Sequence, residues 1–206
     1  MPNTSPSDWT YRPRSAIPTV VAIAVVAAGL AFAQAVSGGP RALGQALPFA
    51  AAGALAGWLC FGKPSVTVAD AGIHVVNPIA VYDVPWAALI LVRTQYTCTF
   101  VTPHRSVRAF AAPGPGRYAA MMASYLDLRD RGGIPSRGTA DLGALPTAPS
   151  GQVATVVQQR WNAMVETGTL PLGEADDTVV ARRLDLRALV VLGALIVLGV
   201  VLQLAL

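Results

Sequence analysis

Three long apolar stretches without a charged residue constrain the fold of this chain more than any other feature of its sequence. They occupy residues 15–40, 42–62 and 188–206. A helix that rises about 1.5 Å per residue needs about 20 residues to cross a hydrocarbon core about 30 Å thick, and each stretch is close to or above that length. The sequence therefore predicts a membrane protein with three transmembrane helices and a polar block between the second and the third.

The first two stretches are joined by only a few residues, which include Gly38, Gly39 and Pro40. Such a Gly-Gly-Pro run is a strong turn signal, so residues 15–62 are predicted to form a tight antiparallel hairpin of two transmembrane helices. Within the second stretch, Gly53 and Gly57 are four residues apart. This spacing of small residues permits close helix approach, and we interpret Gly53 and Gly57 as a helix-packing face.

The basic residues beside the apolar stretches predict the orientation in the membrane. Basic residues accumulate on the cytoplasmic side of membrane helices. Arg41 alone lies in the hairpin loop, whereas six basic residues flank the opposite ends of the stretches: Arg12, Arg14, Lys63, Arg182, Arg183 and Arg187. We therefore expect a multi-pass protein of the plasma (inner) membrane, with residues 1–14 and the polar block in the cytoplasm.

The first apolar stretch has a second interpretation. Arg12 and Arg14, an apolar run and the tripeptide Ala33-Gln34-Ala35 are also typical of a cleaved secretory signal. The length of the run and the second stretch that follows it favour a membrane helix.

Composition and motifs argue against several classes of function. Only 13% of the residues are charged, compared with about 25% in soluble domains. The net charge is +4, and the basic residues do not run together as in a nucleic-acid-binding tail. The two cysteines, Cys60 and Cys98, and the two histidines form no zinc, disulfide or catalytic motif. We expect no nucleic-acid partner, catalytic residue, metal site or cofactor; an enzyme assembled from distant residues remains the less favoured alternative.

The polar block predicts a small α+β domain. Residues 64–113 contain six short alternating segments separated by brief turns, which favours a rolled antiparallel sheet. The segments are residues 65–69, 73–77, 81–84, 89–94, 97–102 and 106–110. Helical periodicity predicts an amphipathic helix within residues 114–133, then a loose Gly/Pro-rich linker over 134–150. Residues 151–187 are predicted to hold a second amphipathic helix, with a packing stripe from Val153 to Met164, and a basic segment before the last membrane helix at 188–206.

Three motifs in this block follow one another in a recognisable order. They are Ala71-Gly72-Ile73, Val76-Asn77-Pro78 and Tyr82-Asp83-Val84-Pro85-Trp86, the last leading into an apolar strand that ends at Val92-Arg93. In this order the block resembles a small bacterial pleckstrin-homology (PH-like) domain of the kind common in actinobacterial membrane proteins. The similarity extends weakly to Arg160-Trp161 and Glu166-Thr167-Gly168.

The resemblance implies a PH-like roll of residues 64–113 beside a transmembrane hairpin, and it implies no assigned biochemical activity. Phosphoinositide-binding PH domains carry basic residues in their first hairpin loop, whereas here that loop contains Asp70. The candidate contacts with anionic lipid or a partner are therefore Arg93, His104, Arg105 and Arg108. The leading hypothesis is a membrane-tethered, non-catalytic interaction module that serves as an accessory or scaffold subunit of a bacterial membrane complex. The alternative is recognition of an anionic lipid surface.

Overall fold

The computed structural model describes residues 8–114, 148–170, 175–176 and 178–205, and the chain divides into two compact units. The helical unit comprises Arg14–Pro64, Asn77–Val81 and Arg183–Leu206. The mixed unit comprises Met1–Pro13, Ser65–Val76 and Tyr82–Arg182. Each unit is considered by itself below.

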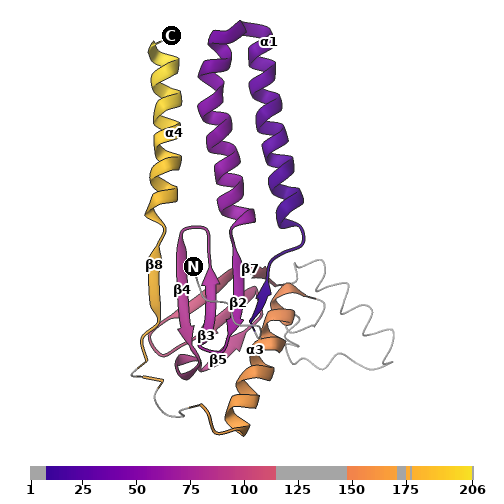
Figure 1. Cartoon of the computed structure of the whole chain (residues 1–206), viewed down its shortest axis with the longest axis vertical. Coiled ribbons are helices and arrows are strands. Elements are labelled where there is room, and N and C mark those ends of the chain that lie inside the picture. The colour runs from indigo at the N-terminus through magenta and orange to yellow at the C-terminus, as the bar shows by residue number, and fades with distance from the viewer. Residues whose placement is uncertain (1–7, 115–147, 171–174, 177, 206) are drawn as a thin grey trace, which may run out of the picture. The chain divides into compact units, whose positions relative to one another are not determined.

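The helical unit is built from α1 (Ala16–Gly57), a π-helix (Trp58–Gly62) that continues it, and α4 (Leu186–Ala205). Inside α1, Gly39 leaves the helical conformation with φ 70° and ψ −163°. Glycine tolerates a positive φ, and the residue before a proline is driven out of the α region, so Gly39-Pro40 bends the chain. The two arms of α1 fold back on each other (Figure 1).

In the part of the chain that the structure describes, two helices qualify by length and composition as candidate membrane spans, rather than the three that the sequence predicts: Ala16–Gly62 and Leu186–Ala205. The first two predicted helices meet directly at the kink at Gly39, without an intervening loop, so together they form one candidate. Only 11% and 6% of the most apolar parts of these helices are buried. Their apolar side chains therefore point mainly outward, which a helix in the core of a soluble protein does not do.

The described part of the mixed unit contains two antiparallel sheets and the helix α3, which confirms the predicted α+β class. The first sheet has the strand order β1-β2-β3-β4-β8. Its strands are β1 (Trp9–Tyr11), β2 (Ser65–Ala69), β3 (Gly72–Val76), β4 (Ala80–Pro85) and β8 (Ala181–Leu184). The second sheet, β5-β6-β7, consists of β5 (Leu91–Arg93), β6 (Thr97–Val101) and β7 (Ser106–Pro113). A short 3₁₀ helix, Trp86–Ala88, lies between β4 and β5, and α3 spans Pro149–Glu166.

Two strands lie where the sequence predicts none. The segment interpreted as an N-terminal tail contributes β1, in which Thr10 pairs with Thr67 of β2. The basic segment before the last apolar stretch contributes β8. Both are short strands at the edges of the sheet, too short for alternation of polar and apolar residues to reveal them.

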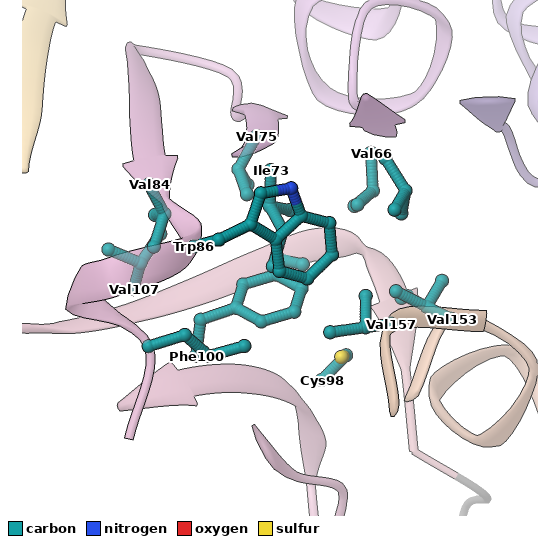
Figure 2. Packing of buried hydrophobic residues seen from close by; sticks show 14 of the residues in the cluster. Val66, Ile73, Val75, Val84, Trp86, Cys98, Phe100, Val107, Val153 and Val157 are labelled. Carbon is teal, nitrogen blue, oxygen red and sulfur yellow. The ribbon is translucent and has the colours of Figure 1, made fainter. Parts of the chain in front are cut away.

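The core of the mixed unit lies between its sheets and α3. Inward-facing residues of β2, β3, β6 and β7 alternate with outward-facing ones, and Val66, Ile73 and Phe100 are fully buried. From α3, Val153 and Val157 enter the same cluster (Figure 2). The predicted stripe on this helix is therefore a packing face directed at the sheets. The predicted helix of residues 114–133 and nearly all of the predicted linker of 134–150 fall outside the described residues, and the last residues of that linker open α3.

Trp86 and the β2–β3 turn hold one corner of the core. The Trp86 indole N–H donates a 3.0 Å hydrogen bond to the Ala69 carbonyl. Gly72 has φ 150°, and a Cβ at this position would collide with the Val84 carbonyl oxygen. Only glycine fits this close backbone approach, which explains the Ala-Gly pair at the turn.

Candidate functional site

The outer face of the β5-β6-β7 sheet brings together two of the four candidate contact residues. In the strand register, Arg93 lies opposite Thr99, and Thr99 lies opposite Arg108. Two strand spacings of about 4.8 Å place the two arginine Cα atoms about 10 Å apart. Both arginines are exposed, whereas Cys98 and Phe100 on the other side of β6 are buried.

Apolar side chains border this row. Leu91 of β5 is exposed on the same face, and Phe110 follows Arg108 on the outward-facing positions of β7 with 54% of its surface accessible. Tyr96, before β6, is 83% accessible. We call the set Leu91, Arg93, Thr99, Arg108 and Phe110 the basic sheet face.

The segment that builds this face has an unusual charge pattern. Residues 84–114 contain three arginines, no lysine, and no aspartate or glutamate. Asp70, which follows β2, and Asp83, which lies in β4, belong to the other sheet. The second sheet therefore contributes a positive surface without a carboxylate of its own.

The other two candidate contacts, His104 and Arg105, lie apart from that row, in the turn between β6 and β7. The Thr102 backbone N–H and hydroxyl both donate to the Arg105 carbonyl, at 2.9 Å and 2.7 Å. The Arg105 guanidinium lies 5.9 Å from the centre of the Tyr82 ring, within the range of a cation–π contact. A His104 ring nitrogen lies 2.7 Å from the Asp176 carbonyl oxygen. The four predicted residues therefore form two separate groups, and the turn pair is engaged in contacts within the chain.

The first hairpin turn is tied to α3 by a contact that the sequence did not predict. Arg160 donates to Asp70 at 2.8 Å and to the Val68 carbonyl at 2.9 Å. Arg160 thus places a positive group beside the acidic loop and holds α3 against the end of β2. Its partner is 90 residues away in the sequence, so no local pattern indicates the pair.

A second unpredicted contact joins the ends of the two apolar helices. Lys63 follows α1 and its π-helix, and its ammonium group lies 2.7 Å from the Asp185 carboxylate. Lys63 also donates to the Pro78 carbonyl at 3.2 Å, and the Asp185 backbone N–H donates to the Ile79 carbonyl at 2.9 Å. The second Asp185 oxygen accepts from the Ala188 N–H in the first turn of α4. The hydrogen bond from Lys63, followed by that from Ala188, lowers the pKa of Asp185 below its usual value.

The two glycines of the predicted helix-packing face, Gly53 and Gly57, differ in how closely other side chains approach them. A Cβ added to Gly57 would lie 2.9 Å from Ile23 Cγ2 on the other arm of α1, so Gly57 is a point of close packing. A Cβ added to Gly53 would meet nothing within 4 Å, and Gly53 lines a cavity of about 770 Å³. The sequence motif therefore marks one contact within the chain and one open surface.

The titratable groups of the described ranges form no recognisable reaction centre. Within those ranges, no three His, Cys, Asp or Glu side chains gather as a metal site would require. Burial in the core raises the pKa of the Cys98 thiol to about 12, which keeps it protonated and unreactive. His74 and Asp83 form a pair between β3 and β4, with Thr67 across from His74 on β2.

Comparisons with known proteins place the chain in no family: no protein-family model, curated protein or solved structure matches it. The resemblance to PH-like domains therefore stays a prediction based on the motifs of residues 64–113.

Proposed function

We propose that this chain is a membrane-tethered interaction module with a PH-like domain, and that it works as a non-catalytic accessory or scaffold subunit of a bacterial plasma-membrane complex. The observation that carries the proposal is the basic sheet face. It combines Arg93 and Arg108 in one row with exposed Leu91 and Phe110, on a sheet without carboxylates.

The composition of this face favours a protein partner. The centres of protein interfaces are enriched in arginine and aromatic residues and depleted in lysine, aspartate and glutamate. The basic sheet face has the same bias. Its positive charge disfavours pairing with the same face of a second copy, because like charges would meet, so the expected partner carries an acidic surface.

The membrane topology is part of the proposal. A straight helix of the length of α1 would extend about 60 Å, twice the thickness of the hydrocarbon core. We therefore place each arm of α1 across the bilayer, with α4 as a further crossing. The basic flanks at Arg12, Arg14 and Lys63 favour a cytoplasmic mixed unit. Labelling of a cysteine introduced at Gly39 tests this topology: labelling of intact cells supports it, and labelling only after permeabilisation reverses it.

Site-directed photo-cross-linking in cells tests the partner surface. A benzoylphenylalanine probe at Leu91 reports on the basic sheet face, and the same probe at Thr67 reports on the outer face of the other sheet. We expect a discrete protein adduct from position 91 and none from position 67. Arg93→Glu should abolish the adduct, whereas the matched charge reversal Arg41→Glu, in the bend of α1, should leave it intact. An adduct that survives Arg93→Glu would contradict the proposal.

The exposed apolar side chains beside the arginines also favour a second candidate, contact of this face with an anionic leaflet. Each arginine near such a surface contributes about 1 kcal/mol, screened over a Debye length of about 8 Å at physiological salt. The full chain in nanodiscs separates the two candidates. A lipid adduct at position 91 that requires anionic lipid and disappears at high salt supports the leaflet, and its absence leaves the protein partner.

A further inference from the structure

The cavity in the helical unit is the second feature that suggests a ligand. It lies along the first arm of α1 from Ala22 to Ser37, against the second arm between Ala46 and Gly53, and reaches Gln203 of α4. At about 1.5 Å per residue, the part along the first arm is roughly 22 Å long. The cavity volume of about 770 Å³ falls within the range of about 300–1,000 Å³ that is usual for ligand sites.

The shape of the cavity follows from where the arms of α1 do and do not pack. At Ile23 and Gly57 the arms meet at van der Waals distance. Towards the bend at Gly39, small residues such as Ala27, Ala50 and Gly53 line the facing surfaces, and they leave the space between the arms unfilled.

The lining is polar at one end only. Gln34 and Ser37 lie within one and a half turns of Gly39, and Gln203 lies in the last turn of α4. Gln45, which donates to the Leu202 carbonyl at 3.3 Å, places the end of α4 at the same level as the bend. From Ala22 to Ala33 every lining residue is apolar. A cavity with a long apolar part and one polar end fits an amphiphilic molecule better than it fits the side of another apolar helix.

We infer that this cavity binds one membrane phospholipid, with an acyl chain between the arms of α1 and its polar end at Gln34 and Gln203. The inference rests on the proposed membrane location. Gln34 and Gln203 lie at the end of the helices beside the bend, where the ester and headgroup oxygens of a phospholipid can accept hydrogen bonds from their amide groups. Because the polar lining residues are uncharged, binding is independent of the lipid's net charge and of salt, in contrast to any contact of the basic sheet face.

Photo-labelling with a defined lipid tests the site. The probe is phosphatidylcholine with a diazirine in one acyl chain, incorporated into nanodiscs with the full-length protein, and adducts are mapped by mass spectrometry. We expect adducts concentrated on the cavity lining, around Ala50. Gly53→Leu fills the space for the acyl chain and should lower these adducts at least about tenfold, equivalent to 1.4 kcal/mol of binding.

The chain offers a matched control. Gly44 lies on the same arm as Gly53, also has open space at its Cβ, and does not line the cavity. Gly44→Leu should therefore leave the adducts unchanged. Both substitutions replace glycine in a helix by a better helix former, so both variants are expected to fold. Ala27→Leu, from the opposite arm, serves as a second filling variant.

Two results would overturn the inference: equal adduct yields in the Gly53→Leu and Gly44→Leu variants, or adducts spread evenly over the outward-facing residues, as expected for a lipid annulus alone. Alkaline carbonate extraction of membranes separates this outcome from failure of the proposed function. A protein released by carbonate refutes the membrane tether, whereas a retained protein with no preferred adduct refutes only the lipid site.

Discussion

The two glycines of the second apolar stretch offer the sharpest test of the helical unit. Sequence reasoning treats Gly53 and Gly57 as one packing face, but the structure separates them. An alanine Cβ at position 57 would lie 2.9 Å from Ile23 Cγ2 and 3.3 Å from Ile23 Cβ. At position 53 it would meet nothing within 4 Å. We therefore predict that the Gly57→Ala variant is less stable than the Gly53→Ala variant.

The magnitude follows from two opposing contributions. Alanine stabilises a helix interior by about 1 kcal/mol relative to glycine, and this gain applies at both positions. Overpacking a close contact costs about 1–3 kcal/mol. Ile23 cannot easily turn aside, because a β-branched side chain in a helix has one strongly preferred χ1 rotamer. We expect Gly53→Ala to stabilise by up to about 1 kcal/mol, and Gly57→Ala to lie about 1–3 kcal/mol below it.

Reversible unfolding in mixed micelles, followed by circular dichroism, measures both variants. Ile23→Ala removes Cγ2 and Cδ1, the two atoms that come closest to the new Cβ, so a double-mutant cycle between positions 23 and 57 should recover most of the lost stability. The same cycle between Ile23 and Gly53 should show no coupling. Equal effects of the two glycine substitutions, or no coupling between positions 23 and 57, would refute the packing of the α1 arms described above.

Three further predictions concern the rest of the chain. Phe100→Ala should destabilise the mixed unit by about 3–5 kcal/mol, because the ring is fully buried. Chemical denaturation followed by tryptophan fluorescence measures this loss, and a loss below about 1 kcal/mol would contradict the core assignment. Gly72→Ala should lower the thermal midpoint by several degrees, since the new Cβ collides with the Val84 carbonyl. In a small domain, each kcal/mol of lost stability lowers the midpoint by about 4–8 °C. An unchanged midpoint would contradict the close approach at Gly72. The pKa of Asp185 is lowered in the folded state, so its contribution is complete above the unfolded value near pH 4 and is lost as the pH falls through the folded value. Asp185→Asn should remove this acid-dependent part, whereas Lys63→Met, which leaves the hydrogen bond from Ala188 in place, should remove only the larger share of it. The contribution is about 1 kcal/mol or less, seen as a shallower loss of thermal midpoint below pH 4.

The α+β class was predictable because its signals are local. The segment of residues 65–69 alternates and ends in a turn with glycine, and β2 has the same bounds. The stripe from Val153 to Met164 repeats at helical spacing, and α3 buries it against the sheets. In contrast, β1 and β8 form only because the chain returns to the sheet from distant segments, and no pattern within three or four residues indicates such pairing.

The sequence predicts which residue types belong to the candidate site, but not which of these residues lie together in space. The absence of carboxylates between residues 84 and 114 is visible in the sequence. The register of β6 with its two neighbours places Arg93 and Arg108 in one row. Arg105 instead lies in the turn after β6, where its guanidinium contacts the Tyr82 ring. A shift of one residue in that register would have exchanged the inward and outward faces, so strand count alone could not place these side chains.

The apolar pattern of the sequence predicts the positions of the candidate membrane helices but not their number. Hydropathy reports where a chain is apolar, and it located both the first and the last candidate span. Whether two apolar runs count as one candidate span or two depends on the backbone at one residue, Gly39, where the two arms of α1 meet at a kink with non-helical angles. Hydropathy also cannot distinguish a small residue that packs, such as Gly57, from one that borders a cavity, such as Gly53. That distinction is the basis of the lipid site inferred for the helical unit, whose lining is uncharged, in contrast to the basic sheet face of the mixed unit. The two surfaces should respond differently to salt because only the charged one is screened.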